Sequence, residues 1–413
     1  MSYLERHITR RVRDALDDTP VVAINGPRQV GKSTLVSGLS FSRTSRYLSL
    51  DDPAIRASAR IDPIEFLDRG VDTLVIDEIQ LEPGLFRALK LAVDHDRRPG
   101  RFLLTGSSRL LAAPDMADSL VGRVETIELA PFTQGELEGR IDRFVDLAFA
   151  DGKDVRTRSE LRRADYIDRL VTGGFPDAVA RTAPRRRRWF TAYLTTALQR
   201  AIAHLADIER AAEIPRILAL CAARSATELN VTNLAGGLSL SRRTVDAYVA
   251  LLRNLFLVQL IPGWATNVSA KTVRRPKVFL ADSGLTAHLL GLSTARLAEP
   301  GMEFGPLLES FVVNEIARQS AWSETDPTLW HFRDRGGAEV DVLLEHPDGR
   351  IVGIEVKAAS MVGPGDFGGL AFLQRRLGSR FHRGLVLYTG PDPLPFGPQL
   401  DAVPISSLWR AGS

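Results

Sequence analysis

The stretch GPRQVGKST, residues 26–34, combines two glycines, a lysine and a hydroxyl at a spacing that suits phosphate chemistry. It matches the pattern G-x-x-x-x-G-K-[S/T]. Glycines let successive backbone N–H groups turn toward phosphates, Lys32 can reach the β and γ oxygens, and the Ser33 hydroxyl can bind Mg²⁺. We therefore predict an ATP and Mg²⁺ site whose loop residues are Gly26, Pro27, Arg28, Gln29, Val30, Gly31, Lys32, Ser33 and Thr34.

Two acids close a second apolar run, DTLVIDEIQ, at residues 72–80. An aspartate at the end of a buried strand beside a phosphate loop meets Mg²⁺ through water, and a following glutamate can orient and deprotonate the attacking water. We interpret Asp77 as the metal-side acid and Glu78 as the catalytic base of ATP hydrolysis. A solvated strand end is the alternative.

Ser107 and Arg123 are two further candidates for nucleotide contact. Ser107 follows the apolar run FLLTG and can contact the γ-phosphate, whereas Arg123 in LVGRVE can act as an arginine finger in cis or in trans. A capping serine and a surface arginine explain the two residues equally well.

A second set of reactive residues lies in GAEVDVLLEHPDGRIVGIEVKAAS, which predicts two strands joined by a turn at HPDG. Glu355 and Lys357 share one face of the second strand, and Asp341 lies within cross-strand reach. Together they fit the D...ExK arrangement of the restriction-endonuclease-like fold, in which the acids bind Mg²⁺ and the lysine stabilises developing charge. Glu309, on an expected helix over residues 305–319, can add a carboxylate. We predict metal ligands at Glu309, Asp341 and Glu355 and catalytic roles for Asp341, Glu355 and Lys357, although such folds also serve as binding modules.

The elements that must position the phosphate loop alternate between strands and helices. Apolar runs at RYLSLDD, RFLLTGSS and RVETIELAPF flank helical stretches such as LFRALKLAVDH. This alternation predicts an α/β domain with a parallel sheet covered on both faces.

The middle of the chain is helical and rich in arginine. Residues 228–264 predict two short helices, the second opening at Ser241, and then a strand, which together make a winged-helix element. Arg242, Arg243 and Thr244 begin the second helix and can reach a DNA groove, although winged helices also serve as packing modules. The basic run at 185–188 precedes three aromatics and favours a solvated arginine face above an aromatic core stripe over nucleic-acid binding.

Composition limits the remaining possibilities. The 413 residues suffice for two or three domains, and the net charge of +3 does not by itself indicate a nucleic-acid protein. A single cysteine, Cys221, excludes an internal disulfide, and its helical surroundings predict a buried core thiol. The charged start lacks the apolar stretch of a signal peptide, and no window reaches about eighteen apolar residues. We expect a cytoplasmic protein without membrane contact.

Four blocks, GPRQVGKSTL, LVIDEIQ, LLTGSS and GRVETIELAPFTQGE, resemble the AAA-like ATPase domain of a widespread bacterial and archaeal family of largely uncharacterised ATP-binding proteins. In this family the AAA domain precedes a DUF4143 domain with a restriction-endonuclease-like C-terminus, and our chain resembles that half over roughly residues 170–400. The resemblance implies four parts. They are a P-loop NTPase domain at 1–140, a helical lid or linker at 141–225, a winged-helix element at 226–300 and a nuclease-like domain at 301–413.

These patterns favour an ATP-hydrolysing enzyme that couples its nucleotide state to a nuclease-like half directed at DNA or RNA. One alternative is an ATP-dependent switch or scaffold with a catalytically inactive nuclease-like fold. Another is a DNA-binding regulator with ATP as effector. A homo-oligomer is compatible with each hypothesis, and metal-dependent strand cleavage separates the first from the others.

Overall fold

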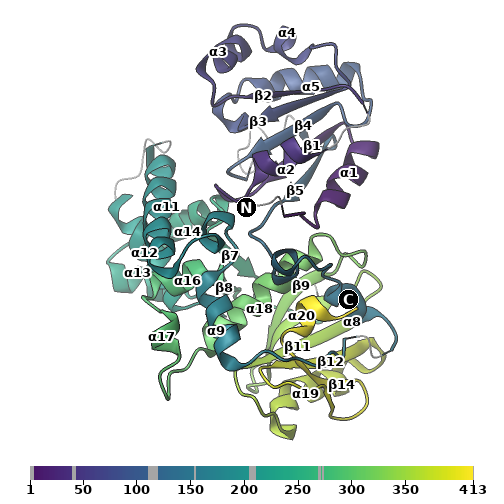
Figure 1. The fold of residues 1–413 in the computed structure, drawn as a ribbon, viewed down its shortest axis with the longest axis vertical. Helices are drawn as coiled ribbons and strands as arrows, with labels where there is room; N and C mark the ends of the chain where they lie inside the picture. The colour runs from purple at the N-terminus through teal and green to yellow at the C-terminus, as the bar shows by residue number, and fades with distance from the viewer. Residues whose placement is uncertain are drawn as a thin grey trace. The chain divides into compact units, whose positions relative to one another are not determined.

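The computed structural model describes residues 4–39, 43–109, 120–152, 155–203, 211–267, 271 and 274–412. The chain divides into two compact units. The first unit holds Glu5–Ala130 with Asn254–Phe256, and the second unit holds Pro131–Arg253 and Leu257–Ser413. Figure 1 shows the fold, coloured along the chain from purple at the N-terminus to yellow at the C-terminus.

A five-stranded sheet forms the centre of the first unit. Its strands are β1 (Val21–Asn25), β2 (Ser45–Ser49), β3 (Thr73–Asp77), β4 (Phe102–Gly106) and β5 (Val124–Glu128). They lie in the order β2-β3-β4-β1-β5, and each neighbouring pair is parallel. Every residue of β1, β3 and β4 is buried, as expected for inner parallel strands covered on both faces. The predicted α/β class with a parallel sheet is confirmed.

Short helices cover this sheet. They are α1 (Thr9–Asp18), α2 (Lys32–Gly38), α3 (Pro53–Ile61), α4 (Pro63–Leu67), the 3₁₀ turn η1 (Ile79–Leu81) and α5 (Leu85–His95). Asp52 and Asp62 begin α3 and α4 as N-caps, each accepting hydrogen bonds from two backbone N–H groups before a first-turn proline. Phe86 and Leu89 of α5 pack with Phe102 of β4 in one core cluster. The sheet is thereby held rigid beneath the loops at its carboxyl ends.

The second unit begins with helices α7 (Gln134–Glu138), α8 (Phe144–Phe149), α9 (Arg163–Thr172), α10 (Pro176–Val179) and α11 (Ala183–Ala203). Thr133 caps α7 in a capping box with Glu136. The arginine run begins α11, where Phe190 and Tyr193 are buried and Tyr193 lies 5.1 Å from the ring of Phe175. The aromatic core stripe beneath partly solvated arginines is confirmed.

The elements with given bounds that follow, within the described residues, are a 3₁₀ turn, three helices and three short strands. They are the turn η3 (Ala211–Glu213), α12 (Ile214–Ala223), β6 (Thr227–Glu228), α13 (Val231–Leu238), α14 (Arg242–Asn254), β7 (Val258–Ile261) and β8 (Lys277–Leu280). The strands pair antiparallel in the order β6-β8-β7. Both helices and the strand that the sequence predicts are present, and Cys221 on α12 is buried as predicted. The winged-helix assignment itself stays a prediction.

The C-terminal part contains α16 (Ser283–Leu289), α17 (Thr294–Leu297), α18 (Gly305–Ser320), α19 (Gly368–Leu377) and α20 (Ser407–Arg410) around a six-stranded sheet. The sheet strands are β9 (Thr328–Arg333), β10 (Glu339–Glu345), β11 (Ile351–Lys357), β12 (Phe381–Tyr388), β13 (Leu394–Pro395) and β14 (Leu400–Pro404), with the turns η4 (Pro364–Phe367) and η5 (Gly378–Arg380). Their order is β13-β14-β12-β11-β10-β9. The predicted antiparallel hairpin is β10–β11. Side chains of β11 alternate between two cores, because Val352 and Ile354 pack with α18 whereas Ile351 packs with α19.

One buried guanidinium joins distant segments of the second unit. Arg318 on α18 donates to the carbonyl oxygens of Phe132 (2.8 Å) and Ala281 (3.0 Å). It also donates to the carboxylates of Glu315 (3.2 Å) and Asp282 (3.4 Å). Only 7% of Arg318 is exposed, so these four acceptors replace the water that the charge gives up on folding.

The two carboxylates extend this network. Asp282 caps α16 through the Leu285 N–H and accepts from the Gly174 N–H at 2.7 Å, while Glu315 accepts from the Gln134 N–H at 3.0 Å. Gly173 has φ +69°, and a Cβ there would collide with the Asp282 carboxylate. Burial raises the pKa of Glu315 to about 8, although its Arg318 partner favours the charged form.

We predict that Arg318→Met lowers the free energy of unfolding of the second unit by roughly 3 kcal/mol, because it leaves two buried carboxylates without their cation. All five tryptophans of the sequence lie in this unit, so a urea titration followed by tryptophan fluorescence reports on it alone. Arg216→Met is the matched control. Arg216 forms an exposed ion pair with Glu213 at 3.2 Å, and its loss should cost less than about 1 kcal/mol. Equal losses in both variants would contradict a central role for Arg318.

Candidate functional site

The glycine-rich loop connects β1 to α2 at the carboxyl end of the sheet. Gly31 has φ +98° and caps α2, and a Cβ at Gly26 would collide with the carbonyl oxygen of Leu129. Gln29 also adopts the left-handed region, with φ +58°. Only glycine satisfies the two glycine positions without strain, so the loop conformation depends on the spacing that the sequence shows.

Lys32 lies folded across this loop. Its ammonium donates to the carbonyl oxygens of Gly26 at 3.0 Å and Pro27 at 2.9 Å, and only 5% of the residue is exposed. Burial lowers the pKa of Lys32 to about 8, although the carboxylates of Glu78 and Asp77 act in the opposite sense. A polyphosphate placed over the loop offers this cation stronger acceptors than two carbonyls.

Three hydroxyl groups converge on the carboxylate of Asp77 at the end of β3. Ser33 donates to it at 3.0 Å, Tyr47 of β2 donates at 2.6 Å, and Thr105 of β4 donates to its other oxygen. The contact between Ser33 and Asp77 joins the first predicted motif to the second. Oxygen ligands of these two kinds suit Mg²⁺, which prefers one or two protein ligands plus phosphate and water.

Glu78 is held beside that group by polar partners from the turn η1, from β4 and from the residue that follows β4. Its carboxylate accepts from the Ser107 hydroxyl at 3.0 Å and from the Gln80 amide, and the same amide contacts Ser107 at 3.0 Å. The Glu78 N–H donates to Thr105 at 3.1 Å, and Glu78 has φ +55°. A non-glycine residue in this region indicates a constraint of the kind found at functional sites.

Arg123 lies away from the phosphate loop. It precedes β5, whereas the loop follows the parallel neighbour β1, so Arg123 lies at the opposite edge of the sheet from the phosphate loop. Its guanidinium pairs with Asp94 of α5 at 2.6 Å. A strand of five residues spans about 16 Å, too far for the side chain to return to its own loop. This placement does not favour an arginine finger in cis, and both the cis and the trans role stay predictions.

The predicted C-terminal site residues form two neighbouring ion-paired groups. Lys277, at the start of β8, pairs with Glu309 (2.8 Å), Glu339 (2.9 Å) and Asp341 (3.1 Å). The second group joins Lys357 to Glu355 at 3.0 Å, with Asp366 at 4.0 Å.

Asp341 connects the two groups, because its other oxygen accepts from the Val356 N–H at 3.0 Å. The structure therefore brings Glu309, Asp341, Glu355 and Lys357 into one region, as the sequence predicts.

Burial and mutual repulsion alter the acidity of this region. Burial and the Asp341 carboxylate raise the pKa of Glu309 to about 8 and that of Glu355 to about 7. Burial disfavours the charged form of Lys277, but Asp341 and Glu309 outweigh it and raise its pKa well above the ordinary range. Lys277 is thus an ammonium at every physiological pH.

These residues do not fit a divalent metal as they stand. The Lys277 nitrogen occupies the point on which three carboxylates converge, at distances longer than the ~2.1 Å of a Mg²⁺–oxygen bond. Within the described part of the chain, no group of three or more His, Cys, Asp or Glu side chains is arranged to hold a metal ion. The metal roles of Glu309, Asp341 and Glu355 stay predictions that this arrangement does not favour.

The start of α14 presents two exposed arginines. Ser241 caps the helix by accepting from the Thr244 N–H at 3.0 Å, and Arg242 and Arg243 are exposed in its first turn. Arg242 lies 3.6 Å from Asp246 in a loose, solvated ion pair. Both guanidinium groups are therefore accessible to a polyanion.

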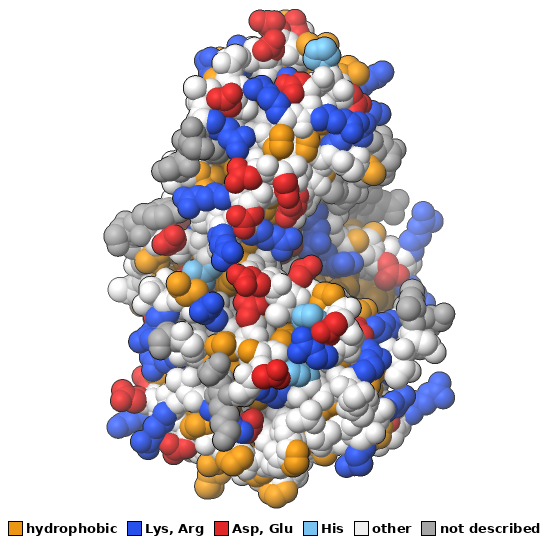
Figure 2. Space-filling model, turned by 90° about the vertical axis from the view of Figure 1, so that its right-hand side faces the viewer, with side chains coloured by type: hydrophobic (Ala, Val, Ile, Leu, Met, Phe, Trp, Pro, Cys, Tyr) orange, Lys and Arg blue, Asp and Glu red, His pale blue; other side chains and the backbone are white. Residues whose placement is uncertain are grey.

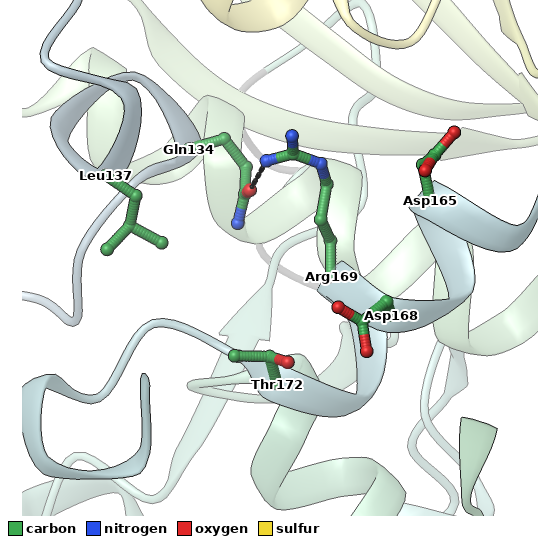
Figure 3. Close-up of a pocket in the computed structure, with 7 residues that line it drawn as sticks. Gln134, Leu137, Asp165, Asp168, Arg169 and Thr172 are labelled. Atoms are coloured by element: carbon green, nitrogen blue, oxygen red, sulfur yellow. Dashed lines mark hydrogen bonds between the residues drawn. The ribbon is translucent and has the colours of Figure 1, made fainter. Parts of the chain in front are cut away.

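A separate pocket of about 290 Å³ lies beside α9 in the second unit. Figure 3 shows Arg169 reaching from α9 toward the amide of Gln134. Asp165, Asp168 and Thr172, which belong to the same helix, also line the pocket. Arg169 also pairs with Glu138 at 2.8 Å. None of the residues predicted to do chemistry lines this pocket, and its arginine already has partners.

Three family models match successive parts of the chain. They are an AAA domain over residues 18–138, a domain of unknown function (DUF8612) over 163–296 and a domain of unknown function (DUF4143) over 304–408. Curated relatives include the uncharacterized protein Mb2031c of Mycobacterium bovis and the uncharacterized protein Rv2008c of Mycobacterium tuberculosis. Each is 29% identical over 413 residues, which cover 99% of this chain and 85% of the relative.

Among solved structures, the chain is similar to the Walker-type ATPase PABY2304 of Pyrococcus abyssi, at 13% identity and a TM-score of 0.42. The match covers 70% of our chain and 96% of that one.

The loop, the acids at the end of β3 and the family match define an AAA-type P-loop ATPase domain. The chain carries this domain followed by a DUF4143 domain, which is the domain order of the family that the sequence resembles. ATP binding and hydrolysis are the activity that such a domain supports, typically with Mg²⁺.

Sequence reasoning missed Lys277, Tyr47 and Gln80. For Lys277 the signal was a lysine opening the apolar run KVFLA, since a buried cation requires acidic partners elsewhere in the fold. Tyr47 and Gln80 carry no such signal, because they meet the site only through strand order and a turn.

We predict that Lys32→Met weakens ATP binding at least tenfold at pH 7, or about 1.4 kcal/mol, because the cation facing the phosphates is lost. Calorimetric titration measures the change, with Lys90→Met on α5 as control. In the wild type, affinity should fall roughly tenfold from pH 7 to pH 9, since Lys32 loses its charge as the pH rises through about 8. An affinity independent of pH in this range would contradict the assignment.

Proposed function

We propose that the first unit hydrolyses ATP and that Ser33 and Asp77 would hold the Mg²⁺ ion that this reaction uses. The contact between these two side chains, at 3.0 Å, supports this proposal best, because it joins the glycine-rich loop to the acid of β3. Bound Mg²⁺ would neutralise phosphate charge. The backbone N–H groups of the loop and Lys32 would hold and orient the β and γ phosphates.

Glu78 is the proposed base. Its carboxylate accepts hydrogen bonds from Ser107 and Gln80, which hold it in place. The base would accept a proton from the attacking water once a γ-phosphate offers Ser107 a new partner. Ser107 would thus respond to the phosphate and free Glu78 together.

We further propose that the nucleotide state controls a nucleic-acid-directed half of a cytoplasmic protein. We propose that the chain consists of a nucleotide domain (1–140), a lid or linker (141–225), a winged-helix element (226–300) and a nuclease-like domain (301–413). Three helices, the strand order β6-β8-β7 and the exposed arginines that begin α14 support the winged helix.

For the C-terminal domain, the arrangement around Lys277 favours an ATP-dependent switch with a binding module over a metal-dependent nuclease. The nuclease reading needs a divalent ion among carboxylates that an ammonium already neutralises. A polyanion-binding surface needs only exposed cations. Figure 2 shows basic and acidic side chains interspersed over the visible face, so any contact with nucleic acid would be local.

None of the described helices is long and apolar enough to cross a membrane.

We predict that Glu78→Gln keeps ATP affinity within about twofold of the wild type and slows hydrolysis at least 100-fold, because the amide retains size but accepts no proton. Phosphate release under single-turnover conditions measures the rate, and Glu65→Gln on α4 is the matched control. Equal rates in the wild type and Glu78→Gln would remove Glu78 from the mechanism.

We predict that the double substitution Arg242→Ala, Arg243→Ala weakens duplex DNA binding at least tenfold and lowers the salt dependence of the binding constant by about two ions. Fluorescence anisotropy at several salt concentrations measures both quantities. Arg296→Ala on α17 should change neither. Unaltered affinity and salt slope in the double variant would assign α14 to protein packing.

A further inference from the structure

The start of β8 places a cation inside the carboxylate group that the hairpin pattern would reserve for a metal ion. Lys277 is 2% exposed, and its nitrogen touches one carboxylate oxygen each from α18, the start of β10 and the body of β10. Two elements that lie far from β8 in sequence, α18 and β10, thus share its one positive charge.

The geometry of this group is that of an ammonium cage. Its three N···O distances of 2.8, 2.9 and 3.1 Å match charge-assisted hydrogen bonds, whereas Mg²⁺ or Mn²⁺ would draw the oxygens in to about 2.1–2.2 Å. An ammonium has three donors, and the three acceptors use them all. No lone pair or coordination position remains for a second cation at this point.

The lysine is anchored independently of the acids. Its strand pairs with β7 on one side and β6 on the other, and Val278, Phe279 and Leu280 are fully buried in the following positions. The backbone of Lys277 therefore cannot withdraw without breaking the three-stranded sheet. A mobile surface lysine could yield to a metal, but this one is held by its strand.

We propose that Lys277 is a built-in counter-ion that occupies the cation position of the nuclease-like domain, so that this domain binds no divalent metal there. The carboxylates of Glu309, Glu339 and Asp341 remain a latent metal site that only removal of the lysine opens. This inference concerns the C-terminal half alone and does not rest on the proposed ATPase.

The test uses the full chain with Asp77→Asn, which weakens metal binding at the nucleotide site. Mn²⁺ binding is counted by electron paramagnetic resonance of the free ion. With Lys277 in place, we expect no bound ion that depends on Asp341. With Lys277→Met, we expect one bound Mn²⁺ per chain, lost again when Asp341→Asn is added.

Thermal unfolding provides a second readout. Saturating Mn²⁺ should raise the melting temperature of the Lys277→Met protein by roughly 5 °C, because the ion binds only the folded state, and should leave the Lys277 protein unchanged. Lys271→Met is the matched control. Lys271 pairs with Glu345 of β10 at 2.6 Å, and Glu345 also pairs with Arg380, so the substitution leaves one carboxylate that still has a cation. It should gain no metal.

Two outcomes would overturn the proposal. One is an ion bound by the protein that retains Lys277 and lost with Asp341→Asn, which means that metal displaces the lysine. The other is a folded Lys277→Met protein that binds no ion, which means that the carboxylates form no latent site. The first arm requires no change at Lys277, so the proposal can be refuted even where Lys277→Met fails to fold. ATP binding, measured separately, bears on neither outcome.

Discussion

A buried charge must have partners, and this requirement organises the second unit. Arg318 loses nearly all its water on folding and recovers hydrogen bonds only where Phe132, Ala281, Asp282 and Glu315 come together. The same carboxylates fix the backbone at Gly174 and Gln134. Segments from four regions of the chain are thus held in one register by a single side chain, with the apolar core of α8, α9, α16 and α18 around it. Apolar packing alone tolerates sliding, whereas a directional network of charges does not.

Lys277 follows the same rule with a different consequence. Lys277 begins its strand in the protein interior, so its buried ammonium requires anionic partners. The carboxylates that pair with it, Glu309 and Asp341, are those that a metal ion would use. Electrostatics here couples fold and function. The charge that stabilises the meeting of β8, α18 and β10 also removes the position a divalent ion would take. A constellation recognised by its acids can therefore be inert because of a residue outside the motif.

In the first unit the corresponding constraint is the parallel sheet. With β4 between β1 and β3, the hydroxyls of Thr105 and Ser107 lie between the glycine-rich loop and the acids of β3. The carboxyl ends of parallel strands meet at one edge, and polar groups gather there because the middle residues of the buried strands are apolar. The same topology keeps Arg123 away from the glycine-rich loop, because Arg123 precedes β5 at the opposite edge of the sheet.

The sequence by itself determined the glycine-rich loop, Asp77 and Glu78, the strands around them with the helix α5, the hairpin β10–β11 and the helix that begins at Arg242. Each of these follows from local spacing or periodicity, because a loop of fixed φ values or a strand of alternating faces is encoded within a few residues. Only the tertiary structure decided that Tyr47 and Gln80 join the nucleotide site, that Arg123 faces away from it, and that Lys277 fills the acidic group of the C-terminal half. Those outcomes depend on the order of the strands in the sheet and on which distant residue pairs with a buried charge. Neither can be deduced from a local sequence pattern.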